Sequence, residues 1–242
     1  MTDKESSKPV LMLLVLLLIW VAPAAGEEWI SLIDTNEMQV DSRPYPGSSL
    51  QEVRGVIYLE TSLNALMALL KDADYNQQWV FRSGGARIVK EEGYERAYVH
   101  GVVDAPWPMQ DRDTVVRFDY EQADNGDITI SIVNFPDFLP AEEPYVRVPD
   151  FGGFWKLKPI GGGCVEVTYQ VYGDPGGWVP VWMANYAAQT SVARTLENMP
   201  RAVKRYRDAH SDNVREVDND GARPVGCLLH DSLAQAKPYE RQ

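Results

Sequence analysis

The strongest constraint on the fold is a long run of alternating polar and apolar residues in the middle of the chain. From Ala86 onward the period is two, and Ile128, Ile130 and Ile132 alternate with Thr129 and Ser131. Such alternation indicates antiparallel strands with one buried face and one solvated face. Glycine- and asparagine-containing turns at 92–93 and 124–127 suit the hairpins between them. This part of the chain therefore predicts a large antiparallel sheet.

Similar segments precede and follow this run, so nine strands are expected in all. They lie at residues 29–33, 38–42, 53–60, 86–90, 96–103, 114–120, 127–134, 154–158 and 164–172. Ser62 is placed to cap a helix with an apolar stripe from Leu63 to Leu70, and a second short helix is expected over 74–79.

A long amphipathic helix is expected to close the domain. Pro180 suits its first turn, and Pro200, which lacks an amide proton, is expected to kink or restart it. One apolar stripe runs along this helix and is wide enough to grip a sheet. The stripe consists of Val181, Ala184, Ala188, Val192, Leu196, Met199 and Val203.

The N-terminus has the pattern of a secretory signal. Lys4 and Lys8 precede an apolar run at 10–22, which is followed by small residues and is short for a membrane span. We expect residues 1–25 to be a signal peptide, although an uncleaved N-terminal anchor fits the same pattern. Residues 27–208 then form one domain, and 209–242 form a mostly irregular tail with a short helix near 228–236. The protein is expected to be exported, either periplasmic or secreted.

Composition excludes several classes of partner. The formal net charge is −12, and removing the signal leaves it unchanged, so nucleic-acid binding is not expected. Any membrane contact has to rest on apolar insertion and not on charge. Cys164 and Cys227 either form one disulfide or stay as two free thiols. No zinc-site spacing exists, and we expect no metal, no cofactor and a monomer.

Two Pro-bounded loops carry the most informative motifs. One reads Trp-Pro-Met-Gln-Asp-Arg-Asp at 107–113, and the other contains Gly-Trp-Val-Pro at 177–180, just before the last helix. In this order, over about 29–207, the chain resembles the START domains, the lipid-transfer domains related to the steroidogenic acute regulatory protein. The resemblance implies an α+β helix-grip fold, in which a curved antiparallel sheet wraps around a long C-terminal helix and encloses a hydrophobic cavity.

Strand parity selects candidate lining residues for such a cavity. If the isoleucine face of the strand at 127–134 is concave, its neighbours contribute side chains of the same parity, although ordinary core packing is the favoured explanation for the aliphatic ones. Asn134 and Tyr169 have polar tips that need a partner, which could be a lipid oxygen or an internal water. The candidates are Val116, Phe118, Asn134, Trp155, Leu157, Val167 and Tyr169.

The resemblance adds candidates at the cavity mouth. Arg112 matches an arginine that lies near the mouth in START relatives, although a salt bridge with Asp111 or Asp113 is an alternative role. A second basic residue is often found further along that strand in relatives. Phe118 occupies its place here, which favours a less polar ligand.

The loop of Trp107 and Met109 is a lid in START domains. Trp178, Trp182, Met183 and Tyr186 lie at the adjacent start of the final helix. These side chains could form a rim that docks on a membrane, and in a second, compatible interpretation Trp107 and Trp182 pack on each other and close the pocket.

The sequence thus predicts an exported lipid-binding or lipid-transfer protein without enzymatic activity. The ligand would be a sterol, phospholipid, fatty acid or similar molecule, exchanged during transient membrane contact. A cyclase- or hydrolase-type enzyme of the same superfamily is the alternative, and it would need a titratable group in the cavity, such as His100 or an Asp/Glu pair. An interaction protein with a collapsed cavity is a third possibility.

Overall fold

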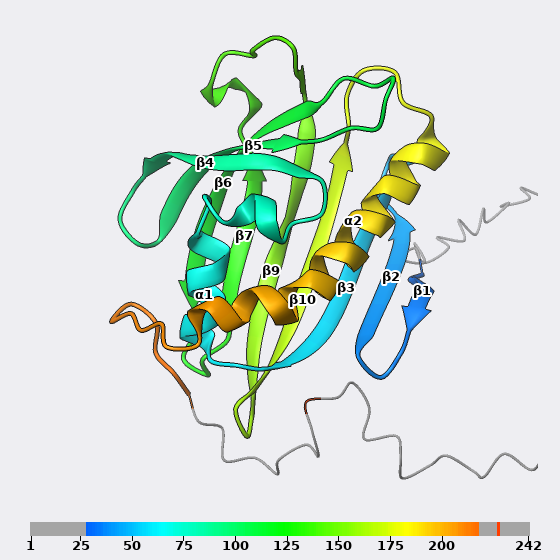
Figure 1. The fold of residues 1–242 in the computed structure, drawn as a ribbon. Coiled ribbons are helices and arrows are strands. Elements are labelled where there is room, and N and C mark those ends of the chain that lie inside the picture. The colour runs from blue at the N-terminus through cyan, green and yellow to red at the C-terminus, as the bar shows by residue number, and fades with distance from the viewer. Residues whose placement is uncertain (1–27, 218–226, 228–242) are drawn as a thin grey trace, which may run out of the picture.

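The alternating segments join into one sheet that runs through the whole molecule (Figure 1). The computed structural model describes residues 28–217 and Cys227. Along the sheet the strand order is β1-β2-β3-β10-β9-β7-β6-β5-β4, and β8 pairs in parallel with the start of β6. All other pairings are antiparallel. The predicted α+β helix-grip architecture is confirmed.

The strands overlap the nine predicted segments, several of them with longer ends, and β8 is the addition. Their bounds are β1 Ile30–Asp34, β2 Met38–Pro44, β3 Gln51–Glu60, β4 Ser83–Glu91, β5 Arg96–Val103, β6 Arg112–Gln122, β7 Ile128–Asn134, β8 Val146–Arg147, β9 Asp150–Gly161 and β10 Cys164–Asp174. The expected signal peptide and the expected helix near 228–236 lie outside the described residues. Within 28–217 and at 227, no helix is long and apolar enough to cross a bilayer.

Two helices lie on one face of this sheet (Figure 1). Helix α1, Leu63–Lys71, begins as predicted, because the Ser62 Oγ accepts a hydrogen bond from the Ala65 amide at 3.1 Å. The second helix expected over 74–79 is wrong, since only a 3₁₀ turn, η1, forms at Asn76–Gln78. There the Asn76 side chain accepts a hydrogen bond from the Ser83 hydroxyl, and the chain turns so that Trp79 is buried.

Helix α2, Val181–Ala202, crosses the sheet diagonally and is fully buried only at positions in its second half. Its buried residues begin at Val192, whereas Val181 at its start is 42% exposed. The helix runs through Pro200 and passes into the 3₁₀ turn η3, Val203–Tyr206. The helix therefore does not restart at Pro200, and its geometry changes from α to 3₁₀ three residues later.

The close approach of α2 to the sheet depends on Gly55 in β3. A methyl group built there would lie 2.3 Å from Leu196 Cδ1 and 2.8 Å from Val192 Cγ1, and both of those side chains are fully buried. The absence of a side chain at position 55 is thus what lets the helix rest directly on the strand.

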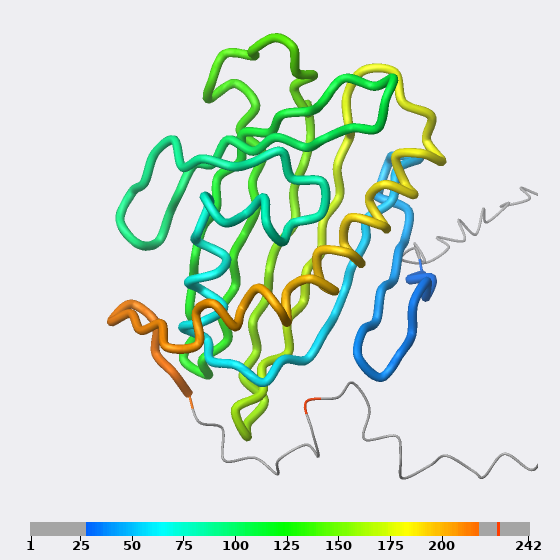
Figure 2. The backbone as a smooth tube through the Cα atoms, viewed as in Figure 1, coloured from blue at the N-terminus to red at the C-terminus, as the bar shows by residue number. Residues whose placement is uncertain are grey.

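After η3 the chain returns beside α1, at the far end of α2 from the loops that precede it (Figure 2). We call residues 211–217 the C-terminal strap. Glu216 accepts hydrogen bonds from the Leu63 and Asn64 amides at 3.1 and 2.7 Å, so it caps α1 from outside. Arg215 and Gln122 exchange two hydrogen bonds of 2.9 and 2.8 Å. The structure also joins Cys164 to Cys227 by a disulfide.

Substituting Gly55 tests whether α2 packs directly on β3 at this position. Gly55→Val should lower the free energy of unfolding by about 1–3 kcal/mol, because the new side chain overlaps Val192 and Leu196. Gly55→Ala should cost less, and adding Leu196→Ala to Gly55→Val should recover part of the overlap penalty. Urea unfolding followed by circular dichroism measures all three. A Gly55→Val protein as stable as the wild type would show that α2 does not rest on this residue.

Candidate functional site

A small cavity lies between the sheet and the layer formed by α1, η1 and α2. Its volume is about 110 Å³. Half of the lining is aromatic, and none of the lining side chains carries a formal charge. The lining residues are Leu70, Asn76, Trp79, Val80, Phe118, Tyr120, Ile130, Ile132, Phe151, Trp155, Tyr169 and Thr195.

Aromatic stacking and two hydrogen bonds from α2 define the shape of this cavity. The Trp155 and Tyr169 rings stack with centroids 3.8 Å apart, and the Trp79 ring lies 6.2 Å from Trp155. On the helix side, Thr195 Oγ1 accepts from the Phe81 amide at 3.2 Å, and Asn198 donates to the Trp79 carbonyl at 2.9 Å. The buried half of α2 therefore fixes the η1 segment that forms one wall.

Two polar groups of the lining lack partners among the described residues. The Trp79 indole N–H is buried without a hydrogen-bond acceptor. The Tyr169 hydroxyl also has no hydrogen bond, and burial raises the pKa of this group well above its usual range, so it stays protonated at neutral pH. Both groups could donate to an oxygen of a bound molecule.

Three of the parity-selected residues, Phe118, Trp155 and Tyr169, line this cavity together. Val116 belongs to the apolar core without lining the cavity, and so do Leu157 and Val167. Asn134 also lies outside it. Its amide donates to the Pro149 carbonyl at 2.7 Å, while its buried oxygen has no partner.

The wall formed by the η1 segment was not predicted from the sequence. Trp79 and Asn76 come from a segment expected to be helical, and Thr195 comes from the helix stripe's polar border. An unpaired tryptophan next to a predicted helix end was the only available signal. Tertiary packing alone shows that it faces the cavity.

The aromatic residues expected at the mouth are the most exposed large apolar side chains of the described chain. Trp107 is 92% exposed, Trp178 88%, Trp182 68% and Tyr186 65%. No ring contact joins Trp107 to Trp182, so the alternative in which these two pack on each other is wrong. We call these four residues the aromatic rim.

Strand β8 contacts both the 104–111 loop, which carries Trp107, and the loop before α2, which carries Trp178. The Val146 amide donates to the Asp111 carbonyl at 2.9 Å, at the end of the 104–111 loop. On the other side, Gly176 has a φ of +67°, and a methyl group built on it would lie 3.2 Å from the Arg147 carbonyl oxygen. Glycine is required there both by this backbone conformation and by the close approach. Both loops therefore pack against the same two-residue strand.

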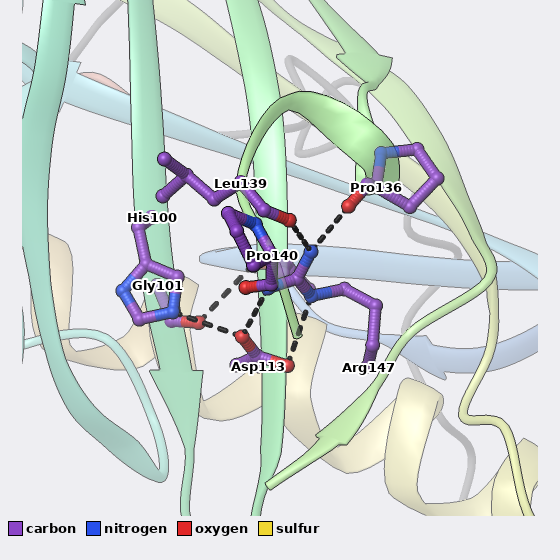
Figure 3. Close-up of polar contacts among 8 residues, drawn as sticks. His100, Gly101, Asp113, Pro136, Leu139, Pro140 and Arg147 are labelled. Carbon is purple, nitrogen blue, oxygen red and sulfur yellow. Dashed lines mark hydrogen bonds and ion pairs between the residues drawn. The ribbon is translucent and has the colours of Figure 1, made fainter. Parts of the chain in front are cut away.

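A buried charge cluster on the outer face of the sheet holds β8 in place (Figure 3). The Asp113 carboxylate accepts two hydrogen bonds from Arg147, at 3.0 and 2.8 Å, and contacts His100 Nε2 at 3.0 Å. Arg147 also donates to the carbonyls of Pro136, Leu139 and Pro140. Burial raises the pKa of Asp113, but the hydrogen bonds and charges of Arg147 and His100 outweigh it and hold this pKa below its usual value.

The contacts of Arg112 and His100 distinguish between the alternative roles predicted for them. Arg112 is buried and donates to the Gln110 carbonyl, and it forms no ion pair with any carboxylate of the described residues, so the expected salt bridge is wrong. His100 pairs across the ladder with Val115, whose parity is opposite to that of Phe118. It therefore lies on the face of the sheet away from the cavity. Among residues 28–217 and 227, no cluster of three or more potential metal ligands occurs.

The fold and the cavity together define a helix-grip protein with an internal apolar binding site. A START domain family model matches residues 19–209, and the chain belongs to the START family.

Similar proteins agree with this assignment. An uncharacterized protein of Pseudomonas aeruginosa is 31% identical over 182 residues, which cover 75% of this chain and 90% of that protein. Human phosphatidylcholine transfer protein is 25% identical, covering 75% of this chain and 86% of its own. The crystal structure of a STAR-related lipid transfer protein fragment from Xanthomonas axonopodis superimposes with a TM-score of 0.68 at 32% identity, covering 73% of this chain and 98% of that one.

Removing the charge of Asp113 tests the cluster. Asp113→Asn should lower the free energy of unfolding at pH 7 by about 3–5 kcal/mol, because Arg147 is left buried without its carboxylate. Asp119→Asn is the matched control. Its ion pairs with Arg96 and Arg117 are more exposed and should contribute about 1 kcal/mol or less.

The pH dependence follows from the lowered pKa of Asp113. Its stabilising contribution should be complete above the unfolded-state value of about 3.9 and should disappear as the pH falls through the lower folded-state pKa. Urea titrations from pH 2 to 7 should show this acid-dependent component in the wild type and not in Asp113→Asn. Identical pH profiles would contradict the assignment.

Proposed function

We propose that this protein is an exported carrier that binds an uncharged hydrophobic lipid in its internal cavity and transfers it between membranes. Membership of the START family supports a lipid-binding role. Human phosphatidylcholine transfer protein and the STAR-related lipid transfer protein of Xanthomonas support the same role by similarity. The signal-like N-terminus supports export to the periplasm or secretion.

The observation that carries the proposal is the chemistry of the cavity lining. Aromatic and aliphatic side chains without formal charge favour burial of an apolar molecule. The unpaired indole N–H of Trp79 and the Tyr169 hydroxyl favour a ligand with at least one acceptor oxygen, such as a hydroxyl, ketone or ester. A charged headgroup has no counter-ion among the lining residues and would have to stay outside.

Loading has to enlarge the cavity, because 110 Å³ is well below the ~300–1,000 Å³ that ligand pockets usually occupy. Neither the first half of α2 nor the 104–111 loop contains a fully buried residue, so we assign the gate to them. Trp107, Trp182 and Tyr186 of the aromatic rim lie on these segments, and Trp178 lies just before α2. It would insert into a zwitterionic bilayer, since tryptophan favours the water–lipid interface and the net charge of −12 disfavours anionic surfaces.

The enzymatic alternative finds little support in the position of the titratable groups. His100 lies on the other face of the sheet, and the lining contains no Asp, Glu, Lys or Cys. Tyr120 and Tyr169 are the titratable residues of the lining, and burial raises the pKa of both hydroxyls, which opposes a role as bases near neutral pH.

Lipid extraction tests the proposed function directly. The purified mature protein is extracted with organic solvent and the extract is analysed by mass spectrometry. We expect one class of uncharged lipid with an oxygen functional group, near one molecule per protein. An empty extract from protein that is shown to be folded, combined with failure to take up lipid from vesicles, would contradict the carrier role.

The aromatic rim generates a second prediction. Trp107→Ala with Trp182→Ala should slow transfer of the extracted lipid between phosphatidylcholine vesicles by about tenfold or more, since each large apolar side chain contributes about 1.5–3 kcal/mol when buried. Flotation with the vesicles should fall in parallel. Ile30→Ala is the control, because Ile30 is 57% exposed but lies on β1 and outside the rim. Unchanged transfer in the double variant would remove the rim from the mechanism.

A further inference from the structure

A second hollow lies behind the cavity and is larger than it. This groove has a volume of about 500 Å³ and opens under the C-terminal strap. Its walls come from α1, from the turn between β4 and β5, from the ends of β6 and β7, and from the strap. The groove residues are Met67, Tyr94, Glu95, Arg96, Asp119, Tyr120, Glu121, Gln122, Ile128, Asn213 and Val214.

Tyr120 is the one residue that lines both spaces. Its parity is that of Phe118, which places its side chain on the concave face of the sheet, and it packs against the apolar core. It therefore stands between the cavity and the groove.

The Tyr120 ring is held in this position by a cation. The Lys71 ammonium lies 3.8 Å from the Tyr120 ring centroid and 4.1 Å from that of Tyr94. The two ring centroids are 6.4 Å apart, and the Lys71 ammonium also donates to the Tyr94 carbonyl at 2.9 Å. Contacts of a cation with two ring faces in a partly buried place are attractive, so they oppose rotation of Tyr120 out of the gap.

From this arrangement we infer that Tyr120 sets the maximum length of the ligand. It ends the cavity on the side away from the aromatic rim, and without its ring the cavity and the groove would form one space within the usual size of a ligand pocket. A ligand that enters from the rim end is stopped at Tyr120. The inference rests on the proposed lipid-binding function and adds a length limit to it.

The test uses straight-chain primary alcohols of increasing length, which supply one acceptor oxygen and no charge. Their binding to the full-length mature protein is followed by the fluorescence of the cavity tryptophans. For the wild type, the affinity should rise about fourfold with each methylene and then stop rising at one chain length. In Tyr120→Ala the rise should continue past that length, so that an alcohol about three methylenes longer than the wild-type limit binds on the order of 50-fold more tightly than to the wild type.

Two matched variants separate the ring from other effects. Tyr120→Phe keeps the ring and should keep the wild-type length limit. Glu121→Ala removes a side chain that lines the groove and not the cavity and takes no part in the Lys71 contacts, and it should also keep the limit. If Tyr120→Ala does not fold, as judged by circular dichroism, Tyr120→Leu replaces it and should extend the limit by fewer methylenes.

The outcomes distinguish this inference from the function on which it rests. The same length limit in wild type and in a folded Tyr120→Ala or Tyr120→Leu protein, with binding retained, would overturn the role of Tyr120 and leave the carrier intact. A wild-type protein that binds no alcohol and yields no extracted lipid would overturn both.

Discussion

The contact between α2 and the bare backbone at Gly55 is the constraint on which the rest of the molecule depends. Val192 and Leu196 reach the sheet only because no Cβ stands in their way. This contact anchors the second half of the helix, from which Thr195 and Asn198 fix the η1 segment and the position of Trp79. The first half has no comparable contact and stays partly exposed. The contact at Gly55 thus anchors the half of α2 that forms the cavity wall, while the start of the helix remains partly exposed.

A buried ion pair on the other face of the sheet positions the 104–111 loop and the loop before α2. The Asp113–Arg147 pair holds β8, and β8 contacts both the 104–111 loop and Gly176. A buried ion pair of this kind contributes little net stability compared with apolar packing, but breaking it is costly. Its effect is therefore to fix the relative position of two loops that have few buried contacts of their own.

Strand parity selected some of the residues that line the cavity and others that do not. Phe118, Trp155 and Tyr169 were found because residues two apart on paired strands share a face. Parity could not tell Val116, which is packed core, from Phe118, because the two residues have the same parity. A salt bridge of Arg112 with a neighbouring carboxylate was the alternative to a place at the cavity mouth, but Asp113 points to the opposite face and pairs with Arg147 from a distant segment.

The sequence by itself determined the sheet, the cap of α1, the long closing helix and the exposed aromatics. These features follow from period-two and period-3.6 patterns, from side-chain capping and from proline, which act over a few residues. The tertiary structure alone decided how large the cavity is, that η1 forms one wall, and that Tyr120 is held between the cavity and the groove by Lys71. It also decided that Glu216 of the C-terminal strap caps α1. These outcomes depend on contacts between residues 49 to 152 positions apart, which no local pattern encodes.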